Sequence, residues 1–395
     1  MRAPVSTRDT RALPRGRGGV TSGPIRLAVD LMWLRPGIVG GSEELVVRQL
    51  AALVDHAADE VSPRLYVLPG FSAAHPGLAV RLPTEVAPVS GKRRPLRVLA
   101  QSTWLFKRTR RHRAQVLHAP GGTLPRLRGA PAVLTIHDLQ YLAFPQYFST
   151  LKLAWLRTAV PAAMKRASVV VTPSNYVRGT VEEAFPGVAG RVKVSPPVVA
   201  TDNSDLQSFD EAALRQRYQL SGPFVVYPAI TYRHKNHRVL LEALALKPDL
   251  VLVLLGGEGP AEADVRETAA RLGVSDRVRR PGRIPADDRD GLYRMATALA
   301  FPSRYEGLGI PVLEAMRLGC PVIAADATAL PETVGGAGLL VPANDAEAWA
   351  EAFTDLADDP AERALLMASG RERVAAFTPE RAAAALVDAY RLALP

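Results

Sequence analysis

Cysteine, long apolar runs and a nucleoside-triphosphate motif are scarce or missing in this chain of 395 residues. The single cysteine, Cys320, excludes a disulfide framework and a cysteine-based zinc site, and its apolar surroundings favour a small buried side chain. No run of eighteen apolar residues occurs, so the sequence predicts no membrane-spanning helix. The pattern Gly-x-x-x-x-Gly-Lys-Ser/Thr is also absent, which excludes a P-loop ATPase.

The composition predicts a folded protein of about two domains. The length corresponds to about two ordinary domains, and 48% hydrophobic residues suffice for two cores. Residues 1–23 contain five arginines and lack the continuous apolar core of a secretory signal. We interpret them as a disordered basic leader and the protein as cytoplasmic.

The net charge of +10 has a local origin. Residues 92–113 contain nine Lys or Arg residues and no acid, with Trp104, Leu105 and Phe106 in the middle. A basic stretch with an apolar centre can lie on an anionic membrane surface, where each basic residue contributes roughly 1 kcal/mol. Nucleic acid could bind the same composition, and a solvated helix face explains it equally well. Of the two binding hypotheses, peripheral contact at the inner face of a membrane is favoured, and no nucleic acid partner is predicted.

Apolar strands alternate with amphipathic helices twice along the chain, which predicts an α/β fold. The strands are continuous apolar runs, as expected for parallel strands covered on both faces. Residues 195–209, with two prolines and a polar run, interrupt the alternation as a linker would. We therefore expect two doubly wound Rossmann-like domains facing across a cleft, with ligands at the carboxyl ends of the strands. Strands are expected at 25–32, 65–68, 116–118, 132–136, 169–172, 224–227, 250–255, 278–280, 298–301, 322–324 and 338–341.

The most informative segment runs from Phe301 to Ile323. A strand enters a loop with Glu306, Gly307 and Gly309, and Pro311 then opens a helix that carries Glu314. Proline is tolerated in a first helical turn, and glycines let the backbone approach a ligand closely. Because a helix N-terminus attracts anions, the loop is a seat for phosphate, while the two carboxylates suit sugar and ribose hydroxyls. The segment therefore indicates a sugar nucleotide.

Other polar residues follow the ends of predicted strands. Lys235 and Arg233 come after one strand, where fixed cations would stabilise a departing nucleoside diphosphate without a metal. The alternatives without a function are an exposed basic loop for these two residues and a buried, hydrogen-bonded core histidine for His137. Further candidates at strand ends are Gly40, Gly41, His118, Gly121, Gly122 and Asp138.

Metal-like patterns are weak. His234 and His237 have no third ligand nearby in the sequence. Asp288-Arg-Asp290 resembles an Asp-x-Asp metal signature, but it heads a predicted helix, where capping explains the acids better. No metal site is predicted.

Taken together, these segments resemble the family 4 (group 1) glycosyltransferases of the two-Rossmann-domain GT-B type, specifically their mannosyltransferase-like subset. Glu306 and Glu314 match that family's Glu-x7-Glu motif. The resemblance extends over roughly residues 25–393 and includes Thr135-Ile-His137-Asp138-Leu139, Val171-Thr-Pro-Ser174-Asn175 and Tyr227-Pro-Ala-Ile-Thr-Tyr-Arg-His-Lys235.

The resemblance implies roles for individual residues. Glu314 would bind the donor's ribose, Glu306 the transferred sugar, and Lys235 with Arg233 the diphosphate. His137 would contact the donor sugar near the reacting carbon. Many members have Arg where this chain has Ile230, so the second cation has to come from Arg233. The remaining implied donor contacts are Gly40, Gly41, Gly307, Leu308 and Gly309, with Arg283 and Ile284 beside the base, and the acceptor-side contacts are His118, Asp138 and Ser174.

The resemblance also implies the organisation of the domains and the reaction. Residues 24–205 would bind the acceptor, residues 206–378 the nucleotide sugar, and 379–395 would form a helix that returns to the first domain. The enzyme would retain anomeric configuration, use no metal or other cofactor, and transfer sugar from a GDP-sugar such as GDP-mannose, or from a UDP-sugar. The acceptor would be a glycan or lipid-linked precursor of a cell-surface polysaccharide.

Two other function classes stay open at this point. A GT-B-fold epimerase, hydrolase or phosphorylase shares the architecture. A non-enzymatic basic protein that binds a membrane or nucleic acid is the second alternative, and it predicts that replacing Glu306 has no effect.

Overall fold

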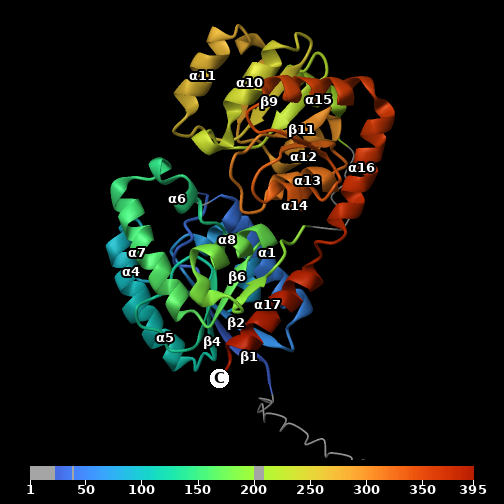
Figure 1. Ribbon diagram of the computed structural model, residues 1–395. Coiled ribbons are helices and arrows are strands. Elements are labelled where there is room, and N and C mark those ends of the chain that lie inside the picture. The colour runs from blue at the N-terminus through green and yellow to red at the C-terminus, as the bar shows by residue number, and fades with distance from the viewer. Residues whose placement is uncertain (1–22, 38–39, 200–208) are drawn as a thin grey trace, which may run out of the picture.

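The computed structural model describes residues 23–37, 40–199 and 209–395. The predicted leader lies outside the described residues except for Gly23, as does most of the predicted linker. The described chain forms two α/β domains, one above the other in Figure 1.

The first domain contains a seven-stranded sheet and eight α-helices among the described residues. Its strands are β1 (Ile25–Asp30), β2 (Val61–Val67), β3 (Thr84–Val86), β4 (Val116–Ala119), β5 (Ala132–Thr135), β6 (Val169–Thr172) and β7 (Val192–Val194). Its helices are α1 (Gly41–His56), α2 (Phe71–Ala74), α3 (Pro76–Arg81), α4 (Arg94–Ala100), α5 (Phe106–Arg111), α6 (Gln140–Ala143), α7 (Thr150–Arg166) and α8 (Asn175–Ala184).

The second domain is built on a six-stranded sheet. Its strands are β8 (Phe224–Tyr227), β9 (Val251–Leu255), β10 (Val278–Gly282), β11 (Ala298–Phe301), β12 (Val322–Ala325) and β13 (Leu339–Val341). Helices α9 (Glu211–Tyr218), α10 (His237–Ala245), α11 (Glu262–Arg271), α12 (Ala286–Met295), α13 (Ile310–Arg317), α14 (Leu330–Val334), α15 (Ala346–Asp358) and α16 (Pro360–Val374) accompany this sheet, and α17 (Pro379–Ala393) ends the chain.

Both sheets are parallel and doubly wound. The strand orders are β3-β2-β1-β4-β5-β6-β7 and β10-β9-β8-β11-β12-β13. In each, the order reverses beside the first strand of the domain, which is where α/β folds bind ligands. The inner strands β4, β5, β6, β8, β11 and β12 are buried along their whole length. The predicted fold class is confirmed, and the run-like apolar pattern has its cause in this two-sided cover.

The last helix crosses between the domains. α16 belongs to the second domain and packs against α13, whereas α17 packs against α1. Leu386 and Tyr390 of α17 are buried in the same cluster as Val29 of β1. Figure 1 shows α17 against the lower domain beside α1, although the two helices are far apart in sequence. The C-terminal helix α17 thus packs on the first domain, although the helix before it, α16, belongs to the second.

Some elements do not follow from the sequence patterns. The edge strands β3 and β7 have three residues each, too short for a periodic signal. Residues 94–111 form α4, a π-helical turn (Gln101–Leu105) and α5 in direct succession, and Leu105 is 1% exposed. Cys320 is buried, as predicted, and burial raises the pKa of its thiol to about 12.

Candidate active site

The loop between β11 and α13 holds the most informative residues of the sequence. Gly309 precedes α13 with φ 98°, a conformation that L side chains rarely adopt, and a Cβ there would lie 2.8 Å from Leu330. Pro311 stands in the first turn of α13, as its missing N–H allows. None of the backbone N–H groups of Gly307, Leu308 and Gly309 donates to another described residue. The loop therefore offers unpaired donors at a helix N-terminus.

Lys235 and Glu306 form an ion pair at the mouth of this loop. The Lys235 ammonium binds the Glu306 carboxylate, and their side chains are 19% and 14% exposed. Lys235 ends a 3₁₀ turn after β8, and Tyr227 of β8 donates its hydroxyl to the Lys235 carbonyl oxygen at 2.7 Å. The next residue, Asn236, adopts φ 56° and donates from its amide to the carbonyl oxygen of Ala343 at 2.5 Å. Packing and hydrogen bonds thus fix the backbone on which the lysine sits.

The first domain touches the loop directly. A Cβ on Gly307 would lie 2.1 Å from the carbonyl oxygen of His137, so only glycine fits at this contact. The Ser174 hydroxyl donates to the Gly307 carbonyl oxygen at 2.7 Å, and the Leu139 N–H donates to the Tyr305 hydroxyl at 3.2 Å. The structure therefore brings His137, Asp138 and Ser174 together with Glu306 across the cleft.

His137 is held as a neutral ring with a defined tautomer. Its Nε2 lies 2.9 Å from the Pro120 carbonyl oxygen, which can only accept, so Nε2 carries the proton and Nδ1 is an acceptor. Burial lowers the pKa of His137. Nδ1 is buried and has no hydrogen-bond partner among the described residues, and the same holds for Nε1 of Trp33, whose ring centroid lies 6.0 Å away. An unpaired acceptor and an unpaired donor thus lie close together in the cleft.

Asp138 faces the cleft beside His137. Desolvation is the largest cause of a raised pKa at its carboxyl group, and the Glu306 charge raises it further. Asp138 accepts a hydrogen bond from the Gln140 N–H at 3.0 Å, which holds the carboxylate at the start of α6.

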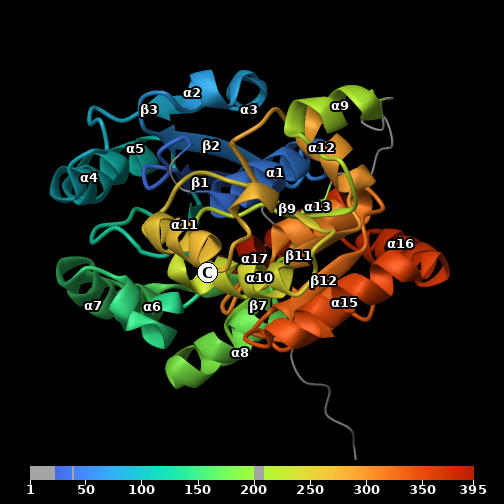
Figure 2. The same cartoon turned by 90° about the horizontal axis from the view of Figure 1, so that it is seen from above.

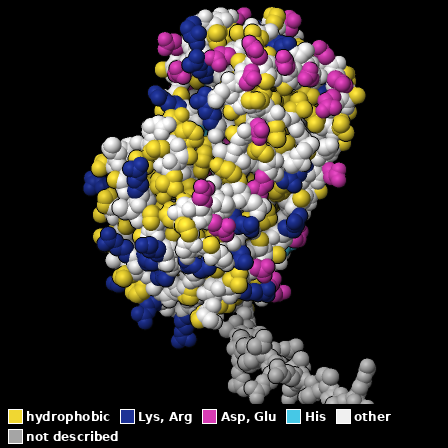
Figure 3. Space-filling model, in the orientation of Figure 1, with side chains coloured by type: hydrophobic (Ala, Val, Ile, Leu, Met, Phe, Trp, Pro, Cys, Tyr) yellow, Lys and Arg dark blue, Asp and Glu magenta, His cyan; other side chains and the backbone are white. Residues whose placement is uncertain are grey.

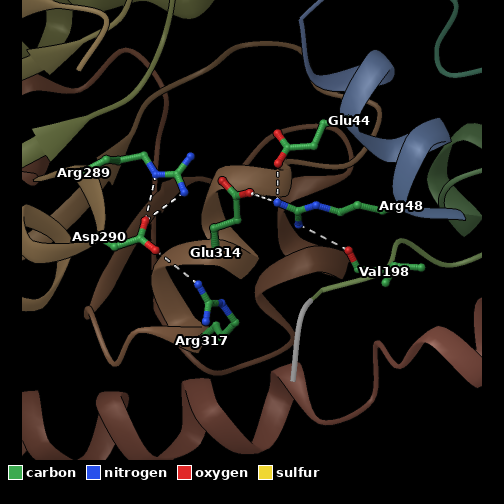
Figure 4. Close-up of polar contacts among 7 residues, drawn as sticks. All are labelled: Glu44, Arg48, Val198, Arg289, Asp290, Glu314 and Arg317. Carbon is green, nitrogen blue, oxygen red and sulfur yellow. Dashed lines mark hydrogen bonds and ion pairs between the residues drawn. The ribbon is translucent and has the colours of Figure 1, made fainter. Parts of the chain in front are cut away.

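Glu314 has a cationic partner that the sequence does not reveal. Its carboxylate Oε1 lies 2.8 Å from an Nη of Arg48, which comes from α1 of the first domain and also binds Glu44 (Figure 4). Glu314 is 7% exposed, and burial is the largest cause of its raised pKa, whereas Arg48 and Arg289 lower it. Each carboxylate of the Glu-x7-Glu motif is therefore paired with a cation in this structure. A separation of 266 residues hides the Arg48 contact from any local pattern.

The loops that carry the other predicted donor contacts also meet across the cleft. Gly40 has φ 80°, and a Cβ on Gly41 would approach the Ile310 side chain at 4.0 Å. Arg283 donates to the Gly37 carbonyl oxygen at 3.1 Å, and Ile284 packs against the core of the second domain. Gly40 and Gly41 thus lie near the start of α13, as a contact with a donor there would require.

Two predicted site residues lie elsewhere. His118 is 2% exposed, and its two ring nitrogens lie 2.8 Å from the Thr135 hydroxyl and 2.9 Å from the Tyr390 hydroxyl. Burial lowers its pKa to about 3, so it is a neutral core residue that anchors α17, and its assignment to the acceptor side is corrected. Arg233 belongs to the same 3₁₀ turn as Lys235, but its side chain is exposed and lines a separate pocket of about 470 Å³ with Tyr147 and Tyr232.

Ser174 and Asp288 have structural partners as well. The Ser174 hydroxyl caps α8 by accepting from the Val177 N–H at 3.2 Å, in addition to its contact with Gly307. Asp288 lies in the first turn of α12 but does not cap it; its carboxylate binds Arg217 at 2.7 Å and Tyr218 at 2.5 Å. The capping interpretation of Asp288 is therefore wrong in detail.

A cavity of about 880 Å³ lies between the domains and reaches Glu314. Its wall includes Arg48 of α1, Arg289 of α12 and Arg317 of α13. The cavity does not reach Lys235, Glu306 or His137; the first two side chains pair with each other in this structure. Within the described ranges, no cluster of three metal-ligating side chains is found, and no helix is long and apolar enough to cross a membrane.

Several solved structures match this architecture over nearly the whole chain. Sucrose-phosphate synthase from Thermosynechococcus elongatus matches with a TM-score of 0.76 at 22% identity, over 93% of this chain and 98% of that one. The Anabaena protein HepE in complex with UDP-glucose matches with a TM-score of 0.72 at 21% identity, over 92% of this chain and 99% of that one. The fold is that of the GT-B class of glycosyltransferases.

Two family models divide the chain between them. The model described as "Glycosyltransferase Family 4" matches residues 39–203, and "Glycosyl transferases group 1" matches residues 211–373. The chain belongs to the family 4 glycosyltransferases and is an enzyme that uses a sugar-nucleotide donor.

Curated relatives include mannosyltransferases. O-antigen chain mannosyltransferase B from Escherichia coli is 29% identical over 290 residues, which is 72% of this chain and 76% of that protein. A GDP-mannose-dependent α-(1-6)-phosphatidylinositol monomannoside mannosyltransferase from Mycolicibacterium smegmatis is 34% identical over 229 residues, 54% of this chain and 59% of that protein. The chain thus spans three quarters of the first relative's length and about three fifths of the second's.

Proposed function

We propose that the protein is a retaining mannosyltransferase that moves mannose from GDP-mannose to a glycan or lipid-linked acceptor of cell-surface polysaccharide synthesis. The observation that carries the proposal is the Lys235–Glu306 ion pair in the β11–α13 loop, whose N–H groups are unpaired and whose Gly307 touches the backbone of His137. The mannosyltransferase relatives support mannose as the sugar and guanosine as the nucleoside.

In the proposed reaction, the second domain holds the donor and the first domain holds the acceptor. The donor's diphosphate takes the place of Glu306 beside Lys235, and the freed Glu306 carboxylate accepts hydrogen bonds from sugar hydroxyls. Glu314 accepts from the ribose hydroxyls, which brings the nucleoside to the start of α13. The Lys235 ammonium and the N–H groups of Gly307 and Gly309 stabilise the negative charge of the departing diphosphate.

His137 assists as an acceptor rather than an acid. Because Nε2 donates its proton to the Pro120 carbonyl oxygen, the unprotonated Nδ1 can accept a hydrogen bond from a sugar hydroxyl. No side chain is assigned as a covalent nucleophile. Since Lys235 and a helix N-terminus supply the positive charge, we also propose that the reaction needs no metal or other cofactor.

The location of the reaction follows from the substrates proposed. We place the protein in the cytoplasm, in peripheral contact with the inner face of the membrane through residues 92–113, and we propose no nucleic acid partner. A lipid-linked acceptor at this membrane surface would be consistent with the basic stretch.

A ligand panel tests the donor. The melting temperature of the purified protein is measured with GDP-, UDP- and ADP-sugars in the presence of EDTA, since a ligand that binds the folded state raises its stability by mass action. GDP-mannose is expected to raise the melting temperature most, with EDTA making no difference. A larger shift with a UDP- or ADP-sugar refutes the donor assignment, and donor breakdown at the same rate with and without acceptor favours a hydrolase.

A further inference from the structure

The basic residues of the chain are concentrated on one side of the first domain. Of 49 Lys and Arg residues, fifteen lie between residues 92 and 166, where Asp138 is the only acid. The rest of the chain holds 34 basic and 38 acidic residues, so this segment accounts for the whole positive net charge. In Figure 3, blue side chains gather on the side of the lower domain where α4, α5 and α7 lie, whereas magenta ones gather on the second domain.

Large exposed leucines lie among these basic residues. Leu96 and Leu99 of α4 are 49% and 59% exposed, Leu127 is 52% exposed, and Leu151 in the first turn of α7 is 85% exposed. The apolar residues at the centre of the stretch face the other way, since Leu105 is 1% exposed and Trp104 packs edge-on against Tyr66. The helical segment 94–111 therefore packs one apolar side, with Leu105, into the core and exposes a second apolar side, with Leu96 and Leu99, to solvent.

Contacts join the leucines into one surface. The Arg94 guanidinium at the start of α4 lies over the Trp155 ring of α7, 4.8 Å from its centroid. The Arg126 N–H donates to the Ser102 hydroxyl at 3.1 Å, and Arg166 at the end of α7 donates to the Arg126 carbonyl oxygen at 2.8 Å. Both ribbon views place α4 and α7 on the same side of the molecule (Figures 1 and 2). We call this surface of α4, residues 125–128 and α7 the leucine face.

We propose that the leucine face docks onto an anionic lipid bilayer. A bilayer is the partner that uses both features, because its acyl region buries leucine side chains and its headgroups pair with Lys and Arg. Nucleic acid would use the basic residues but would leave the leucines in water. The docking surface is broader than residues 92–113, since it includes Leu151 and Lys152 of α7.

The leucine face adjoins the active site through a row of aromatic rings. Lys152 lies over the Phe148 ring at 4.9 Å, and the neighbouring Tyr147 stacks on Phe144 with centroids 5.2 Å apart. Phe144 in turn meets Tyr305 edge-on at 5.8 Å, next to Glu306. If the proposed function holds, a lipid-linked acceptor enters the cleft from this end of α7, its sugars passing over these rings. The docking itself does not depend on the donor or on the reaction.

Vesicle sedimentation with matched variants tests the proposal. The full chain is mixed with phosphatidylcholine vesicles that contain either no or 30% (roughly a physiological anionic fraction) phosphatidylglycerol, at low and high salt. The leucine variant carries Leu96→Ser, Leu99→Ser and Leu151→Ser, and its control carries Leu246→Ser, Leu340→Ser and Leu365→Ser, which are exposed leucines of the second domain. The basic variant carries Lys92→Gln, Arg93→Gln and Lys152→Gln, and its control carries Arg178→Gln, Lys193→Gln and Arg271→Gln, all exposed outside the leucine face.

The proposal expects binding to anionic vesicles that weakens with salt. The basic variant should bind about a hundredfold more weakly at low salt, which corresponds to about fivefold for each residue. The leucine variant should lose about tenfold for each buried leucine, while both controls bind like the parent.

Other outcomes overturn the proposal. Equal binding to neutral and anionic vesicles, or a leucine variant that binds like the parent, contradicts it. A parent that binds duplex DNA more tightly than vesicles, with the leucine variant unchanged, identifies the face as a nucleic acid surface instead. The GDP-mannose thermal shift is measured on all five proteins: its absence from the parent refutes the proposed donor and leaves the docking result standing.

Discussion

Replacing Arg48 with methionine tests the contact that links the two domains at Glu314. The variant removes the cation and keeps most of the side-chain volume, so Glu314 stays buried without its nearest partner. The Glu314 side chain is 9% exposed and that of Arg48 is 26% exposed, which places the pair between a surface ion pair and a fully buried one. Arg289 remains as a weaker influence on the carboxylate.

The expected loss of stability follows from this intermediate burial. Removing one partner of a buried pair costs about 3–5 kcal/mol, and an exposed pair contributes at most about 1 kcal/mol. We expect Arg48→Met to cost about 2 kcal/mol at pH 7, or roughly 4 to 8 °C in melting temperature. Because the pKa of Glu314 is raised and would rise further without Arg48, the cost should shrink as the pH falls and the carboxyl protonates.

Melting temperatures across a range of pH measure this effect. Arg81→Met is the matched control, since Arg81 pairs with Asp55 on the surface, where the side chains are 39% and 48% exposed. The double variant Arg48→Met with Glu314→Gln should recover most of the loss at neutral pH. If Arg48→Met is as stable as Arg81→Met, or if its cost is unchanged when Glu314 is neutral, the contact does not stabilise the closed cleft.

Three further variants test other parts of the molecule. Burial raises the pKa of Asp30 from 3.8 to about 6, so the stability that protonated Asp30 contributes is lost as the pH rises through 6. Asp30→Asn has no such loss, so it should gain about 3 kcal/mol in stability relative to the parent between pH 3 and pH 8. A difference in melting temperature that is the same at all pH values contradicts this. Trp33→Phe removes the unpaired N–H together with the pyrrole ring, so some loss of stability is expected. If a substrate hydroxyl binds that N–H, kcat/KM for transfer should also fall about tenfold, and an unchanged kcat/KM refutes the contact. The Glu332 carboxylate accepts hydrogen bonds from the backbone N–H groups of Asn175 and Tyr176 at 2.8 Å across the cleft. Glu332→Ala should therefore cost about 1–2 kcal/mol of stability and enlarge the radius of gyration measured by solution scattering. Glu347→Ala, at an exposed position of α15, is its control.

Local patterns were enough to predict the fold and the central loops. Buried parallel strands leave continuous apolar runs, and the glycines around Glu306 mark a backbone that must approach something closely. In the structure the close neighbour of Gly307 is the carbonyl oxygen of His137, a residue that the sequence also singled out. The strand ends thus singled out Lys235, Glu306 and His137, whose loops meet in the structure.

Contacts between distant segments could not be predicted in the same way. Arg48 is one of several charged residues on α1, and nothing near it indicates that it meets Glu314. His118 lies at the end of a predicted strand, close to where a site residue is expected, but Tyr390, 272 residues later, covers it and makes it a core residue. The outward leucines of α4 were hidden because Trp104 and Leu105, the more apolar centre of the stretch, face the core.

The central claim is that Glu306 binds the sugar of a nucleotide-sugar donor, and transfer by a Glu306→Gln variant tests it most directly. Labelled sugar from the nucleotide sugar that best stabilises the parent is followed into lipid-extractable and polysaccharide products, with the melting temperature as a check on folding. The account predicts that Glu306→Gln folds like the parent but transfers at least about a hundredfold more slowly, because the amide accepts fewer hydrogen bonds and carries no charge beside Lys235. Transfer at the parent rate by a folded Glu306→Gln protein would contradict it.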